Sequence, residues 1–143
     1  MITILAGGKP HQPWLQEITS EYEKRLKKPF QIKWEFYEEE KLLKKLSNWP
    51  FSGNDFVILT DERGENLSSP AFAKTLEKAQ ISSKNIIILI GGAYGFPEEI
   101  RQKSDLIWSF SNLVFPHQIA RLIVAEQIYR AQEILAGSPY HHI

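Results

Sequence analysis

The residues best suited to chemistry lie near the end of the chain, in residues 110–118 (FSNLVFPHQ) and 137–143 (GSPYHHI). The first segment runs directly into a long helical pattern. The second places Tyr140, His141 and His142 directly after Pro139. These side chains can position a ligand and donate hydrogen bonds to it, whereas most residues at a chain end only keep it soluble. Chain ends are usually poorly specified. This composition therefore predicts that the tail forms part of a functional site.

Two loops follow buried strands, where ligands bind in α/β sheets. Residues 91–95 (GGAYG) resemble neither the G-x-G-x-x-G fingerprint nor a phosphate loop with its Lys-Ser/Thr. They could approach a ligand closely or form a simple glycine turn. In residues 61–64 (DERG), Asp61 or Glu62 could bind a ligand hydroxyl or act as a base, and a solvated turn is the alternative.

The final helical pattern carries His117, Arg121, Glu126 and Arg130. Glu126 and Arg130 have the spacing of an ion pair, and His117 at the helix start could meet a ligand or a phosphate. The basic residues among 24–28 could contact RNA phosphates or simply end the first helix in solvent. His141 and His142 are adjacent and lack a helical or carboxylate partner, so we expect no metal site.

Strand-length apolar runs alternate with helix-length patterns along the chain. We expect strands at residues 2–6, 30–36, 56–59, 86–90 and 106–110, and helices at 14–28, 38–46, from 69, near 97, and from 116 to about 136. The runs at 56–59 and 86–90 are apolar throughout, as in central strands covered on both faces. This order predicts an α/β fold with a largely parallel sheet.

The last helix is apolar around nearly its whole circumference, which predicts burial on more than one side. In so small a protein, one of those sides is expected to meet another subunit. We therefore expect a homodimer.

Composition narrows the class of protein. The 143 residues are expected to form a single domain over residues 1–143. Seventeen basic residues balance seventeen acidic ones, so any nucleic-acid contact must come from a local patch. Without cysteine there is no disulfide, thiolate nucleophile or thiolate zinc site. We expect no signal peptide, no membrane span and a cytoplasmic location.

Several of these segments together are similar to a known family. Residues 109–118 (SFSNLVFPHQ), Arg121, 126–131 (EQIYRA), Ile134, Gly137 and 139–142 (PYHH) resemble the ribosomal large-subunit RNA methyltransferase H family. The resemblance extends to residues 2–9, 21–26 and 90–92, and so spans nearly the whole chain. Members of that family belong to the SPOUT superfamily and methylate N3 of a pseudouridine in 23S rRNA.

The resemblance implies a parallel-sheet SPOUT fold with a C-terminal trefoil knot, a homodimer, 23S rRNA in the large subunit or ribosome as substrate, and S-adenosylmethionine as methyl donor. It assigns cofactor contacts to residues after the third, fourth and fifth strands: Thr60, Gly91, Phe110, Ser111, Asn112, Leu113, Val114 and Phe115. Pseudouridine N3 reacts only once deprotonated. A base or a positive field would help, and the catalytic candidates are Tyr140, His141, His142 and Arg130.

This chain departs from most members in a shorter connection between Lys28 and Asp55, in Val114 where threonine is frequent, and in the final Ile143 where many end on a basic residue. Three other functions stay open. They are a SPOUT methyltransferase with another RNA target, a catalytically silent ribosome- or RNA-binding protein, and a flavodoxin-like nucleotide binder whose loop glycines serve phosphate.

Overall fold

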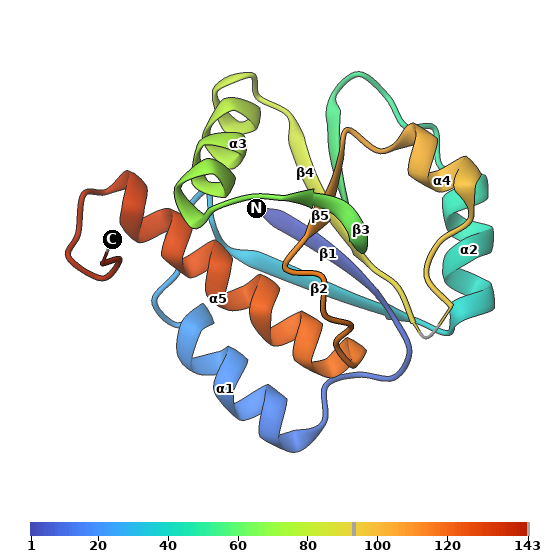
Figure 1. The fold of residues 1–143 in the computed structure, drawn as a ribbon, viewed down its shortest axis with the longest axis horizontal. Helices are drawn as coiled ribbons and strands as arrows, with labels where there is room; N and C mark the ends of the chain where they lie inside the picture. Colours follow the sequence, from blue (N-terminus) through green and yellow to red (C-terminus); the bar gives the residue numbers. More distant parts are fainter. Residues whose placement is uncertain (93, 143) are drawn as a thin grey trace.

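The chain folds around a five-stranded sheet in which every neighbouring pair of strands is parallel (Figure 1). The structure is a computed structural model that describes residues 1–92 and 94–142. The strand order is β2-β1-β4-β3-β5, with bounds Ile2–Gly7 (β1), Ile32–Tyr37 (β2), Asp55–Asn66 (β3), Asn85–Ile90 (β4) and Leu106–Ser109 (β5). The predicted parallel α/β sheet is confirmed.

Helices connect the strands and cover both faces of the sheet, as parallel pairing requires. Their bounds are Pro13–Glu23 (α1), Glu39–Ser47 (α2), Ser69–Ile81 (α3), Glu98–Lys103 (α4) and His117–Leu135 (α5). Helices α1, α3 and α5 pack together on one face, and α2 and α4 lie on the other (Figure 1).

The central strand β4 shows why its sequence is apolar throughout. Ile86, Ile88 and Ile90 point into the core under α1, α3 and α5. Ile87 and Leu89 point into the core under α2 and α4. Successive strand residues face opposite sides of a sheet, so a strand covered on both sides needs apolar residues at every position.

Helix α1 is shorter than the predicted 14–28 and buries a different face. It ends at Glu23, with Lys24 as its C-cap. Its buried residues are Leu15 and Thr19, whereas Trp14 and Ile18 are each 39% exposed. The helix thus ends six residues before Pro29. The basic cluster at 24–28 therefore lies beyond the helix.

Strand β3 is longer than predicted. Residues 61–64, expected to form a loop, continue the strand, which pairs with β5 on both sides of a register shift between Thr60 and Glu65. The extension places Asp61 and Arg63 beside the pocket, at the carboxyl ends of the neighbouring strands. At the start of α3, Ser68 supplies the N-cap: its hydroxyl accepts a hydrogen bond from the Ala71 amide at 3.2 Å.

Helix α5 is buried along much of its length, including Val124, Ala125, Ile128 and Ala131. Leu122 and Ile123 remain partly exposed. None of the helices in the described part of the chain combines the length and apolar character that a membrane crossing needs.

Candidate active site

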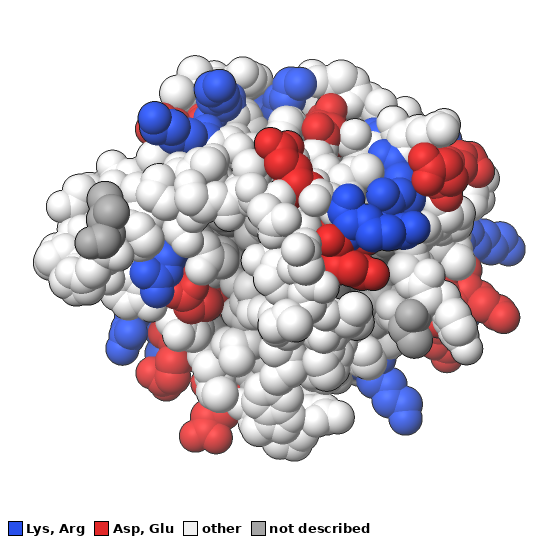
Figure 2. Space-filling view, in the orientation of Figure 1, with Lys and Arg blue, Asp and Glu red and all other residues white. Residues whose placement is uncertain are grey.

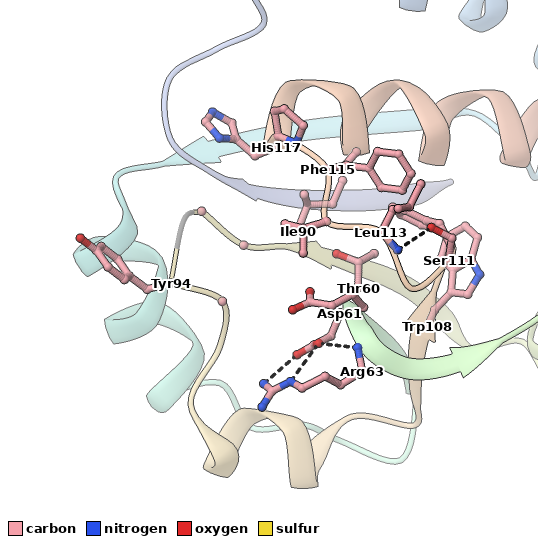
Figure 3. Close-up of a pocket in the computed structure, with 18 residues that line it drawn as sticks. Thr60, Asp61, Arg63, Ile90, Tyr94, Trp108, Ser111, Leu113, Phe115 and His117 are labelled. Carbon is pink, nitrogen blue, oxygen red and sulfur yellow. Dashed lines mark hydrogen bonds and ion pairs between the residues drawn. The ribbon is translucent and has the colours of Figure 1, made fainter.

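A pocket of about 600 Å³ opens at the carboxyl ends of β3, β4 and β5 (Figure 3). Its walls come from the end of β3, the loop after β4, the loop between β5 and α5, and the first turn of α5. Of the eight residues to which the resemblance assigns cofactor contact, seven line it: Thr60, Gly91, Phe110, Ser111, Leu113, Val114 and Phe115. Asn112 does not line the pocket, and it is exposed.

Side-chain hydrogen bonds hold the loop between β5 and α5. The buried Ser109 hydroxyl lies 2.8 Å from the carbonyl oxygen of Ser111 and 3.1 Å from that of Glu62. The amide of Leu113 donates to the Ser111 hydroxyl at 3.0 Å. The Phe110 ring meets Trp108 edge-on, with centroids 4.7 Å apart. The aromatic and aliphatic wall of the pocket is therefore preorganised rather than loose.

The loop after β4 brings backbone to the pocket. A Cβ on Gly91 would lie 3.0 Å from the Phe96 ring, and one on Gly92 would overlap the Glu39 carboxylate. The positive φ in this loop occurs at Gly95 (69°) rather than at Gly91. Glycine is therefore required at position 91 because a side chain would collide with the Phe96 ring, and it is favoured at position 95 because the backbone there has a positive φ. Beside them, the Thr60 hydroxyl donates to the Leu89 carbonyl at 3.0 Å.

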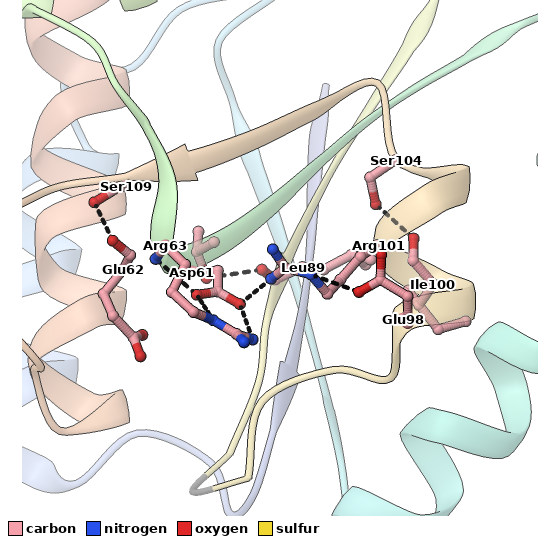
Figure 4. Close-up of polar contacts among 10 residues, drawn as sticks. Asp61, Glu62, Arg63, Leu89, Glu98, Ile100, Arg101, Ser104 and Ser109 are labelled. Atoms are coloured by element: carbon pink, nitrogen blue, oxygen red, sulfur yellow. Dashed lines mark hydrogen bonds and ion pairs between the residues drawn. The ribbon is translucent and has the colours of Figure 1, made fainter.

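A charged cluster forms one side of the pocket (Figure 4). Asp61 accepts from the Arg63 amide at 2.8 Å and from the Arg63 guanidinium, and it also pairs with Arg101. Burial alone would raise the pKa of Asp61, but the Arg63 hydrogen bonds and the charges of both arginines outweigh burial and lower it. Asp61 is thus an ionised anchor for two arginines. It lies in β3 with its carboxylate mostly buried, not in the solvated turn that was one alternative, and its pairing with both arginines argues against the other, a base.

The C-terminal candidates form a second cluster. Arg130 pairs with Glu126 at 2.7 Å, as its spacing predicted, and Arg130 Nη1 lies 3.0 Å from His141 Nδ1. The Arg130 guanidinium stacks 4.9 Å from the Tyr140 ring centre, and the Tyr140 hydroxyl donates to Glu126 at 3.3 Å. Burial, followed by the Glu126 charge, raises the pKa of Tyr140 to about 12. Tyr140 therefore stays protonated near neutral pH and can donate a hydrogen bond.

This second cluster is remote from the pocket of the same chain. None of the four catalytic candidates lines the pocket. His117 lines it at the start of α5, and Arg130 follows 13 positions later, about 20 Å along a helix. Figure 1 shows the C-terminus beyond the far end of α5. His142 is exposed, and Ile143 lies outside the described residues.

The tail is attached to the rest of the fold through Tyr140. Its ring packs against the main core and meets Tyr129 at a centroid distance of 4.8 Å. The chain turns back after Gly137 (φ 73°) and lays Tyr140 against α5.

Sequence reasoning singled out Arg121 but missed its partner. Arg121 is fully buried; its Nη2 donates to the Gly7 carbonyl at 3.1 Å, and its Nη1 lies 3.4 Å from His11 Nδ1. Burial lowers the pKa of Arg121 to about 10. Burial, followed by the Arg121 charge, lowers the pKa of His11 to about 4. Nothing local in the sequence indicates that His11, which is partly buried, contacts Arg121, because the two residues are 110 positions apart.

Metal ligation was not expected from the sequence. Over residues 1–92 and 94–142, no three His, Cys, Asp or Glu side chains gather closely enough to hold a metal ion.

The sequence also matches a family of known proteins. Residues 1–141 match the family model described as "Predicted SPOUT methyltransferase". Proteins named ribosomal RNA large subunit methyltransferase H are similar over nearly their whole length. The one from Dictyoglomus thermophilum is 39% identical (99% of both chains), and that from Protochlamydia amoebophila is 42% identical (98% of this chain, 97% of the relative). The one from Geobacter metallireducens is 37% identical, over 99% of this chain and 98% of the relative. With this pocket at the ends of its parallel strands, the chain belongs to the ribosomal RNA large subunit methyltransferase H family of SPOUT methyltransferases.

Proposed function

We propose that this protein transfers the methyl group of S-adenosylmethionine to N3 of a pseudouridine in 23S rRNA. The observation that carries the proposal is the pocket lined by seven of the eight expected cofactor residues. Its volume of about 600 Å³ suits a small organic ligand. The names of the relatives support ribosomal RNA as substrate. Such a substrate implies a cytoplasmic location.

The residues of the pocket fit such a methyl donor. Phe110, Leu113 and Phe115 offer an apolar wall for an adenine ring, and Gly91 lets the backbone approach. Bound S-adenosylmethionine supplies a methyl group already activated on a sulfonium. The protein is then left to bind the two reactants, align them and exclude water. Consistent with the family, we further propose that the segment from β5 into α5 threads a trefoil knot.

We propose that the active site is completed in a homodimer. Arg130, Tyr140 and His141 lie about 20 Å from the pocket of their own chain by the rise of α5, so they cannot reach its methyl group. A second copy could bring its tail there if the two α5 helices lie antiparallel. Figure 2 shows a largely uncharged surface over α5 and the start of α1, where Trp14 and Ile18 are exposed. This surface would be covered in the dimer.

The enzymatic proposal is tested by mass analysis of 23S rRNA from cells with and without the protein. We expect one methylated pseudouridine to disappear on deletion and to return with the wild-type gene, but not with Gly91→Val. Methylation lost at another nucleotide would favour the SPOUT enzyme with a different RNA target. Unchanged rRNA, together with no S-adenosylmethionine binding by calorimetry, would favour the silent RNA-binding protein.

The dimer is tested by mixing two inactive variants. Gly91→Val impairs the pocket and Arg130→Ala impairs the tail cluster, while each variant keeps the other part intact. Random re-association makes half of the dimers mixed, and each mixed dimer has one intact composite site of two. We therefore expect about a quarter of wild-type activity from the mixture, by this counting on an isologous dimer. No activity in a mixture shown by mass to contain mixed dimers would mean that the tail does not act on the partner's pocket.

A further inference from the structure

Exposed apolar side chains concentrate at the mouth of the pocket. In the described part of the chain, seven large apolar or aromatic side chains are exposed, and three of them line this pocket. They are Tyr94 (92% exposed), Val114 (78%) and Leu113 (69%). Single exposed apolar residues are ordinary, but a cluster around one opening indicates a contact surface.

Tyr94 differs from the other tyrosines of the fold in lacking any partner within the described residues. Tyr37, Tyr129 and Tyr140 each direct the hydroxyl to a carboxylate at 2.5–3.3 Å. Within residues 1–92 and 94–142, Tyr94 has no such bond and no ring partner. At 92% exposure its ring adds almost nothing to the core. Its presence beside the pocket therefore calls for a partner outside the chain.

The backbone holds this ring out from the protein. The amide of Gly95 donates to the carbonyl of Gly92 at 3.3 Å, which closes a turn around Tyr94. Gly95 takes the positive φ that the turn needs. Figure 3 shows Tyr94 on the opposite side of the opening from Leu113, with its ring directed outward. A flat aromatic face is thus presented at the entrance to the pocket.

We propose that Tyr94 stacks on an unpaired base of the substrate RNA at the mouth of the pocket. This inference rests on the proposed function. A base methylated at a ring nitrogen must leave its neighbours in the RNA stack, and proteins replace that lost stacking with aromatic side chains. Arg63 pairs with Asp61 but keeps 68% of its side chain exposed; it lines the same pocket and can also meet a phosphate of the same strand. Proteins that bind single-stranded RNA combine such aromatic faces with positive charge.

The test compares Tyr94→Ala, Tyr94→Phe and Tyr94→Trp with the wild type. Ile81→Ala is the matched control, because Ile81 is 77% exposed and does not line the pocket. The substrate is large ribosomal subunits from cells lacking the protein. We expect Tyr94→Ala to lower kcat/KM for the subunit by about 5- to 150-fold, the range for loss of one stacked base. Tyr94→Phe and Tyr94→Trp should stay within about threefold of wild type, because they keep an aromatic face.

Two further measurements separate stacking from its rivals. The Kd for S-adenosylmethionine and the mass in solution should be the same in all variants and the wild type. A weaker cofactor Kd in Tyr94→Ala would mean that the ring covers the cofactor, and a lower mass would mean that it is a subunit contact. Either result, or failure of Tyr94→Phe to restore activity, overturns the proposal.

Binding of a fluorescently labelled rRNA hairpin distinguishes this inference from the proposed function, because it needs no methyl transfer. A wild-type protein that transfers no methyl group refutes the proposed function. The stacking contact still stands if Tyr94→Ala binds the hairpin 5- to 150-fold more weakly. Equal hairpin affinity of Tyr94→Ala and wild type refutes the stacking contact, whether or not the wild type methylates RNA.

Discussion

The partly buried contact between His11 and Arg121 predicts how stability depends on pH. The pKa of His11 is lowered to about 4 in the folded protein, first by burial and then by the Arg121 charge. In the unfolded chain it returns to about 6.5. Between these values the unfolded state binds more protons than the folded state. The stability that the neutral imidazole contributes is thus fully present above pH 6.5 and declines as the pH falls toward 4.

The size of this effect follows from the two pKa values. For pKa values of about 4 and about 6.5, linkage alone gives a loss of about 2 kcal/mol between pH 7 and pH 5. Because the imidazole is only partly buried, solvent screening reduces the expected loss to about 1 kcal/mol. With a typical urea m-value of about 2 kcal/mol/M, the urea midpoint should fall by about 0.5 M. His11→Gln removes this proton, so the variant should lose about 1 kcal/mol less than the wild type over the same interval.

The assay is urea unfolding followed by circular dichroism at pH 5, 6 and 7. Protein concentration is held equal because association would shift the midpoint. His142→Gln is the control, since His142 is exposed, and its curve should run parallel to that of the wild type. Carboxylates titrate in all three proteins and cancel in the comparison. If wild type and His11→Gln lose the same free energy between pH 7 and pH 5, the imidazole is not held neutral by its surroundings.

Three further outcomes are expected. Gly64→Ala should destabilise the protein by about 1–3 kcal/mol or more, because its Cβ would lie 2.5 Å from a carbonyl oxygen of β5. Gly53→Ala is the control and should be neutral, because its Cβ would have nothing within 4 Å. Equal melting temperatures of the two variants would contradict this prediction. Gly91→Val should weaken S-adenosylmethionine binding at least about tenfold by calorimetry, since its side chain would press on the Phe96 ring and displace the loop that lines the pocket; undiminished binding would exclude Gly91 from the cofactor site. Deleting residues 139–143 should lower stability by about 1–2 kcal/mol, because it removes the Tyr140 ring from the core, and should reduce methyl transfer by orders of magnitude; full activity would show the tail to be dispensable.

The class of fold and the edge of the sheet that holds the pocket could be predicted from the residues alone. Continuous apolar runs such as residues 86–90 are typical of strands buried on both faces, and their alternation with helical patterns favours parallel pairing. Parallel strands end at the same edge of the sheet. Residues that follow different strands, such as Gly91 and Phe110, are therefore brought together by topology alone. The family resemblance added the chemistry that this edge serves.

Contacts and distances between residues far apart in the sequence became visible only in the folded structure. The extension of β3 through Asp61 and Arg63 arises from its pairing with β5, which no local pattern in residues 61–64 indicates. The contact between Arg121 and His11 joins a residue within α5 to the segment before α1, which lies 110 positions away in the sequence. The separation of the tail from the pocket is set by the length and direction of α5. Local propensity fixes elements, whereas distances between side chains on different elements come from how those elements pack. For that reason the tail could be recognised from its residues, but its distance from the pocket could not.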